Sequence, residues 1–173
     1  LFNTDLCYTQ DTSPNAIILR AHSKGIVQYL TKICGITANK KVDIVAIPEI
    51  IKKADDRIKF AFLRGLADTD FTVTFKNRCN KGHDYPVIKG SFRSEKLIQD
   101  LEIVFKELGF KHSVYYNEIK KDARLSHDTI IHNIYLYGRL NFHRWLNLIG
   151  FSNHKFNRKV EKWLREGVCP PGY

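Results

Sequence analysis

The chain has 173 residues, enough for one hydrophobic core or two small ones, and its 28 Lys and Arg residues outnumber 18 Asp and Glu residues, for a net charge of +10. It has no apolar run long enough to span a bilayer and no signal-peptide pattern. We therefore expect a soluble intracellular protein, in the cytoplasm, the nucleoid or an organelle matrix, with no membrane partner. The four cysteines form no C-x-x-C pair, which argues against a zinc site or a disulfide framework.

The basic surplus is unevenly distributed along the chain. Residues 1–70 carry 10 basic and 8 acidic side chains, whereas residues 71–173 carry 18 and 10. Such a concentration of positive charge is typical of a protein whose partner is rich in phosphate, although many basic soluble proteins bind no nucleic acid. The sequence contains no methionine, which suggests a fragment of something longer.

The first third of the chain predicts a hairpin, a helix and a linker. Strands are expected over residues 5–10 and 16–21, joined by a turn rich in Asp, Ser, Pro and Asn. Ser23 is suited to cap a helix that ends near Gly35, because its apolar residues recur at helical spacing. These residues are Ile26, Leu30 and Ile33. The segment 37–53 is basic and interrupted by a proline, so we interpret it as a linker.

The next stretch predicts a helix that carries two carboxylates to its end. Asp55 or Asp56 can cap it, and Ile58, Phe62 and Leu66 fall on one apolar stripe. On another stripe lie Ala61 and Gly65, two small residues four apart that allow close approach of a second helix. The helix runs without a proline into its two acids, Asp68 and Asp70, and then directly into a strand.

A β-hairpin is predicted after this helix. Apolar and polar residues alternate over residues 71–78, and again over a second strand that follows a turn at residues 80–84. The inner face is assigned Val73, Phe75, Ile88, Gly90 and Phe92. The outer face is assigned Thr72, Thr74, Lys76, Arg78, Tyr85, Val87, Lys89, Ser91 and Arg93. The four basic residues of this outer face have no acid among them on these two strands, whereas a solvated surface usually mixes both signs.

The remaining elements complete an alternating pattern. Ser94 is suited to cap a helix that ends at Gly109, strands follow over residues 112–119 and 130–137, and two helical segments close the chain. The residues expected to be buried are Leu97, Ile98, Leu101, Val104, Phe105, Leu108, Ile134, Leu136, Phe142, Trp145, Leu146, Ile149, Phe156, Val160 and Leu164. This order of helices and strands predicts an α+β fold.

The chain also shows a weak internal repeat. Ile26, Leu30 and Ile33 fall 116 positions before Phe142, Leu146 and Ile149. We therefore predict that the opening strand, strand and helix copy the closing half of the later unit. The expected organisation is a partial first repeat with its linker over residues 1–54, a complete repeat over 55–168 and a tail over 169–173.

The segment from Leu63 to Asp70, LRGLADTD, resembles the signature of the LAGLIDADG, or dodecapeptide, family of homing endonucleases. In this alignment Asp70 takes the position of the metal-binding aspartate. Residues 85–94 look like the family's second strand leading into a capped helix, and residues 149–153 look like its characteristic ending. An amphipathic helix with an acidic end is the simpler interpretation of the motif alone, but the similar elements on both sides favour the family.

This resemblance implies an αββαββα unit whose curved antiparallel four-stranded sheet lies along the major groove of double-stranded DNA. It also implies that two units pack through their motif helices, so a second repeat is a necessary partner, either a missing N-terminal part or a second copy of the chain. The implied helix interface comprises Ala61, Gly65 and Asp68, the last with a structural role. The implied DNA contacts are Thr72, Thr74, Lys76, Arg78, Tyr85, Lys89, Ser91 and Arg93.

The family mechanism implies that Asp70 binds Mg²⁺ or another divalent cation, shared with the acid of the partner helix, for phosphodiester hydrolysis. A lysine near the centre commonly assists, and the candidates are Lys40, Lys41 and Lys155. Three features depart from the family pattern, one of which is that the partial first unit lacks half of its sheet. Phe71 replaces a glycine, and its bulk is expected to crowd the site. The first motif helix is absent, so this chain supplies one of the two acids.

The leading functional hypothesis is a site-specific, divalent-metal-dependent DNA endonuclease of the homing type, associated with an intron or an intein. Protein splicing by this segment is not expected, because its start has no catalytic cysteine and its end no His-Asn pair. The alternative is a catalytically degenerate protein that binds DNA, or intron RNA as a splicing cofactor. A third possibility, an unrelated small-ligand-binding α+β domain, lacks a Gly-rich phosphate loop or a nucleophile constellation in its favour.

Overall fold

A computed structural model of the chain describes residues 7–10, 17–20, 22–36, 43–78, 82–121 and 128–173. The turn predicted at residues 11–15 lies outside this part of the chain, as do Lys40 and Lys41. None of the described helices is long and apolar enough to cross a membrane.

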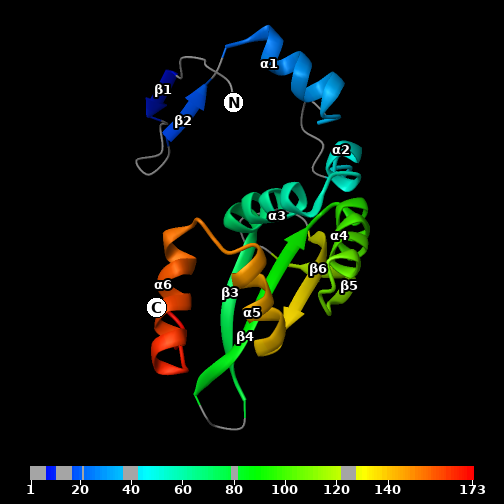
Figure 1. Cartoon of the computed structure of the whole chain (residues 1–173). Coiled ribbons are helices and arrows are strands. Elements are labelled where there is room, and N and C mark those ends of the chain that lie inside the picture. The colour runs from blue at the N-terminus through cyan, green and yellow to red at the C-terminus, as the bar shows by residue number, and fades with distance from the viewer. Residues whose placement is uncertain (1–6, 11–16, 21, 37–42, 79–81, 122–127) are drawn as a thin grey trace.

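The larger part of the chain folds as the predicted αββαββα unit followed by one more helix (Figure 1). Its elements are α3 (Asp56–Asp70), β3 (Phe71–Asn77), β4 (His83–Phe92), α4 (Glu95–Glu107), β5 (Ser113–Lys120), β6 (Thr129–Tyr137), α5 (Gly138–Leu148) and α6 (His154–Glu166). The four strands form one antiparallel sheet in the order β3-β4-β6-β5. The α+β class and the order of elements are therefore confirmed.

The opening segment also follows the predicted order of elements. Strands β1 (Cys7–Gln10) and β2 (Ile17–Arg20) pair antiparallel, and α1 (Lys24–Gln28) continues into the π-helical turn η1 (Tyr29–Ile33). Ser23 caps α1 as expected, since its hydroxyl accepts from the amide of Ile26 at 3.3 Å. That this segment copies the later unit stays a prediction, as do the domain boundaries.

The segment interpreted as a linker is docked on the complete unit. It contains the short helix α2 (Glu49–Lys52), and Ile47 is buried. The Ile47 amide donates to Asp100 of α4 at 3.0 Å, and the Ser94 hydroxyl donates to the Val45 carbonyl at 2.5 Å. Asp100 is itself buried and also accepts from Lys96 at 2.8 Å. These contacts fix the path by which the chain enters α3.

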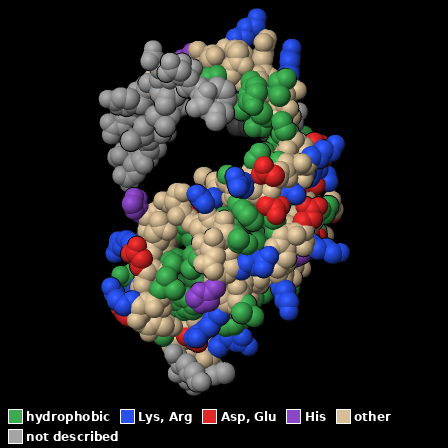
Figure 2. All heavy atoms as spheres, in the orientation of Figure 1, with side chains coloured by type: hydrophobic (Ala, Val, Ile, Leu, Met, Phe, Trp, Pro, Cys, Tyr) green, Lys and Arg blue, Asp and Glu red, His purple; other side chains and the backbone are tan. Residues whose placement is uncertain are grey.

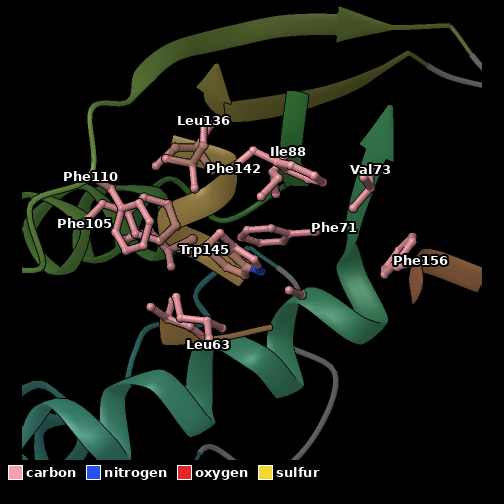
Figure 3. Close-up of a cluster of buried hydrophobic side chains, with 14 of the residues drawn as sticks. Leu63, Phe71, Val73, Ile88, Phe105, Phe110, Leu136, Phe142, Trp145 and Phe156 are labelled. Carbon is pink, nitrogen blue, oxygen red and sulfur yellow. The ribbon is translucent and has the colours of Figure 1, made fainter. Parts of the chain in front are cut away.

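The core lies between the inner face of the sheet and the helices that cover it. Figure 3 shows Phe71 and Trp145 at its centre, with Leu63 of α3 on one side and Phe105 of α4 nearby. The stripe predicted for α4 is buried in full. The residues that form it are Leu97, Ile98, Leu101, Val104, Phe105 and Leu108. Val73, Ile88, Ile134 and Leu136 supply the sheet side of the core.

One predicted core position on α6 is wrong. Leu164 is 56% exposed, whereas its neighbour Trp163 is buried. The reason lies in the contacts of Trp163: its ring stacks on Phe75 with 5.7 Å between centroids, and its indole nitrogen donates to the Asp84 carbonyl at 2.8 Å. A large ring with a polar edge can satisfy both contacts, which leaves Leu164 on the solvent side.

Candidate active site and nucleic-acid interface

Helix α3 places the Asp70 carboxylate at one end of the sheet. Asp55 caps the helix by accepting from the Ile58 amide at 3.1 Å, and the chain passes from Asp70 straight into β3. The Asp70 side chain is exposed, and it accepts a hydrogen bond from the Thr69 hydroxyl at 2.8 Å. It lines a hollow of about 360 Å³ together with Ser91 and other residues from the end of β4. The carboxylate is thus accessible and fixed beside the sheet.

Phe71 does not crowd this carboxylate, contrary to the expectation from the motif. Its side chain is buried and packs against Trp145 and Phe92, with 5.9 Å between ring centroids in both pairs. Its backbone is extended, with φ −94°, so the position does not require a glycine. Because the helix runs directly into a strand, residue 71 takes the first inward position of β3, and Figure 3 shows its ring pointing into the core.

Asp68 joins α3 to the start of α6. Its carboxylate accepts from the backbone amides of Ser152, at 3.0 and 3.1 Å, and Asn153, at 3.1 Å. The Asn153 side chain returns a hydrogen bond to the Asp68 carbonyl at 3.0 Å and also caps α6. Asp68 is therefore engaged within this unit, in the capping role that the family suggests, and its part in a helix interface stays a prediction.

The other implied interface residues lie on an open face of α3. Leu63 and Ala67 face the core, whereas Ala61 and Gly65 are exposed. A Cβ atom added to Gly65 would meet none of the described atoms within 4 Å. The small-residue face predicted for a second helix is consequently uncovered by the described part of this chain.

The predicted nucleic-acid contacts of the two strands share the outer face of the sheet. In β3, exposed Thr72, Thr74 and Lys76 alternate with buried residues. In β4, Lys89 pairs across from Thr72, and Tyr85 pairs across from Lys76. These alternating faces are the ones the sequence predicts. Val87 also lies on the outer face but is buried, because it pairs between Thr74 and Tyr137.

The two arginines of this set lie beyond the strand ends. Arg78 follows β3 and stacks over the Tyr85 ring, with 4.3 Å from its guanidinium carbon to the ring centroid. Arg93 follows β4 and forms an ion pair of 2.9 Å with Asp43 of the docked segment. Arg93 would therefore have to exchange this partner for a phosphate, a competition that local sequence patterns do not reveal.

The sequence analysis missed the tyrosines that line the centre of the outer face. Tyr135 and Tyr137 of β6 stack in parallel with 5.2 Å between centroids, and Tyr115 of β5 meets Tyr135 edge-on. Lys89 lies over Tyr135 and Lys76 over Tyr137, at 5.3 and 5.5 Å from the ring centroids. Burial, followed by the neighbouring Tyr115 and Tyr135, raises the pKa of Tyr137 to about 12. In the sequence, the two-residue spacing of Tyr135 and Tyr137 along β6 was the signal that could have placed both rings on one face of the sheet.

The described residues supply one free carboxylate ligand at this end of α3, Asp70. No group of three or more His, Cys, Asp or Glu residues that could hold a metal occurs in the described ranges. A carboxylate is a suitable ligand for Mg²⁺, but a complete site needs further oxygen ligands from the nucleic acid, water or a second unit. Lys155 is exposed in the first turn of α6, and among the described contacts its side chain has none with Asp70.

Comparison with known proteins identifies the family. A family model described as LAGLIDADG-like domain matches residues 57–150, from the first turn of α3 to the end of α5. A search of curated proteins found no match. The matched range covers more than half of the chain and contains the motif helix, the whole four-stranded sheet and α4. This protein belongs to the LAGLIDADG family.

Proposed function

We propose that this protein is a DNA endonuclease of the homing type that cuts a specific double-stranded site. The observation that carries the proposal is the place of Asp70: an exposed carboxylate at the end of the motif helix, in a hollow shared with residues of the outer sheet face. Lys76 and Lys89 lie on that same face. Cations that can bind phosphate therefore lie on the sheet that begins at a carboxylate able to bind metal, with Lys89 opposite Thr72 and Lys76 further along β3.

Each site residue of this chain has a separate role in the proposed reaction. Lys76 and Lys89, held over tyrosine rings, contact phosphates or guanine edges and set the register of the duplex on the sheet. Asp70 would hold a divalent cation, with Mg²⁺ the expected ion, and that ion would polarise the scissile phosphate and activate water. Asp68 holds the start of α6 in place. The open Ala61 and Gly65 face receives the second unit, which brings the second acid.

The test uses Asp70→Asn, which keeps the size of the side chain and removes its charge. We expect wild-type protein with Mg²⁺ to cut a duplex selected by binding, and Asp70→Asn to retain binding while its cutting falls at least about 100-fold, the equivalent of about 2.7 kcal/mol. Asp56→Asn, an exposed acid at the other end of α3, is the matched control and should cut normally. Undiminished cleavage by Asp70→Asn would refute the assignment.

A second candidate function is a non-catalytic splicing cofactor that binds RNA. The parallel rings of Tyr135 and Tyr137 favour it, since aromatic side chains on a sheet stack with unpaired bases. This function predicts tighter binding to a structured RNA than to duplex DNA, strong salt dependence, and no nicking with any divalent cation. Tyr135→Ala should then weaken RNA binding more than duplex binding.

A further inference from the structure

The outer face of the sheet carries an acid held in a fixed position. Asn133 of β6 is fully buried beneath this face; its amide oxygen accepts from the Ser91 hydroxyl at 2.5 Å, and its amide nitrogen donates to Oε2 of Glu118. Ser91 and Asn133 are cross-strand partners. The chain of hydrogen bonds runs from β4 through β6 to β5, so Glu118 is tethered from the middle of the sheet.

A β-bulge in β5 explains why Glu118 points outward. Tyr115 pairs with Asn133, but Glu118 pairs with Ile131, so β5 contains one residue more than β6 between these two pairs. The extra residue reverses the alternation, and β5 faces outward at Tyr115 and again at Glu118. Asn117 within the bulge adopts a left-handed backbone with φ 57°, which asparagine tolerates better than most residues.

Glu118 shares a hollow with two lysines. The hollow has a volume of about 580 Å³, and its lining includes Lys89, Lys120 and Ile131 as well as Glu118. A carboxylate on a face that meets phosphates is repelled by the backbone of the duplex, so its presence is favourable only where it accepts a hydrogen bond from the partner. In the major groove the exocyclic amine of cytosine is such a donor, and carboxylates pair with it.

Both cytosine and adenine offer an amine in the major groove, and the lysines beside Glu118 favour cytosine. Cytosine pairs with guanine, whose O6 and N7 atoms accept hydrogen bonds at the same groove edge and suit a lysine donor. Adenine also offers an amine, but in the A·T pair this amine lies between two separate acceptors, adenine N7 and thymine O4, and not beside the adjacent pair of acceptors, O6 and N7, that guanine presents to a lysine. We propose that Glu118, positioned by Asn133 and Ser91, is a specificity-determining residue that accepts from the N4 amine of cytosine in a G·C pair. This inference rests on the proposed binding of duplex DNA.

The experiment selects bound sequences from randomised duplex DNA with the full chain, its Glu118→Gln variant and a control, Glu161→Gln. Glu161 is exposed on α6, so its change alters the net charge equally without touching the sheet. We expect the wild type and the control to require cytosine at one position. In Glu118→Gln the amide oxygen can keep the bond from Asn133 and present an NH₂ donor instead, so the preference at that position should fall about tenfold or more.

The outcomes separate this inference from the proposed function. If the wild type binds duplex DNA and Glu118→Gln selects the same sequences, Glu118 does not determine specificity and the inference is overturned alone. If Glu118→Gln loses preference evenly at every position, its role is structural, and the inference is overturned as well. Circular dichroism of each variant shows whether the fold is retained. If the wild type binds no duplex, the proposed function falls, and the inference with it.

Discussion

Replacing Phe71 by glycine tests whether the motif or the core governs this position. Glycine is the residue that the family signature has here, so a design based on the motif would introduce Phe71→Gly to improve the site. The structure predicts the opposite result. The Phe71 ring is buried against Trp145 and Phe92, and it lies directly over Gly90, where an added Cβ would come within 2.7 Å of it. Its removal leaves a cavity that a glycine cannot fill.

The expected loss of stability can be estimated from two contributions. Truncation of a buried phenylalanine to alanine costs about 3–5 kcal/mol in typical cores. A glycine within a strand costs roughly a further 0.5–1 kcal/mol because of its greater backbone freedom in the unfolded chain. Domains of this size are stable by about 5–15 kcal/mol, so Phe71→Gly is expected to remove a large part of the unfolding free energy.

Urea unfolding monitored by tryptophan fluorescence measures this loss, and Trp145 is a nearby buried reporter. Thr72→Gly is the matched control: it introduces a glycine at the next residue, exposed on β3, and should cost only about 1 kcal/mol. If the unfolding free energy of Phe71→Gly lies within about 1 kcal/mol of the wild-type value, position 71 does not belong to the core.

The remaining predictions concern two carboxylates that organise the fold. Asp68→Ala removes the acceptor of the Ser152 and Asn153 amides and should lower the unfolding free energy by about 1–3 kcal/mol; an unchanged melting temperature would contradict this role. Burial alone would raise the pKa of Asp100, but hydrogen bonds from Lys96 and the Ile47 amide lower it below its ordinary value of 3.8. Its ionised form therefore stabilises the fold above that pH, and the contribution is lost as the pH falls through the lower folded pKa. Asp100→Asn should lower the unfolding free energy by about 2–4 kcal/mol near neutral pH, and the difference in unfolding free energy from the wild type should narrow below pH 3.8. A difference that does not change with pH would refute this role of Asp100.

The surface charge pattern bears on the choice between the two candidate functions. Figure 2 views the molecule from the side on which helices cover the sheet, and there basic and acidic side chains are interspersed. On the outer face of β3 and β4, by contrast, Lys76 is exposed and Lys89 half-buried, and the one acid of these two strands, Asp84, forms an ion pair with Arg139 at 3.1 Å. The opposite sides of the unit thus differ in character, and the outer face of the sheet is the better candidate for contact with phosphates.

Much of the fold could be predicted from local patterns. Helix α3 has a capping residue at Asp55 and ends where strict alternation begins, although the residues it buries are Leu63 and Ala67, whereas Ile58 of the predicted stripe is exposed. The stripe of α4 and the two faces of β3 follow from spacing alone, because each depends on periods of 3.6 and 2 residues that a short window contains. The same window holds the motif that places Asp70.

The features of the site that the sequence did not predict depend on contacts between residues far apart in the chain. The inward turn of Phe71 requires the space over Gly90, and the ion pair of Arg93 with Asp43 requires the docked segment before α3. The outward position of Glu118 requires a bulge, and a single added residue reverses every side chain that follows it in the strand. The sequence by itself therefore determined the unit, its elements and the place of Asp70. Only the tertiary structure decided which neighbours each side chain meets, because register and packing are set by residues far apart in the chain.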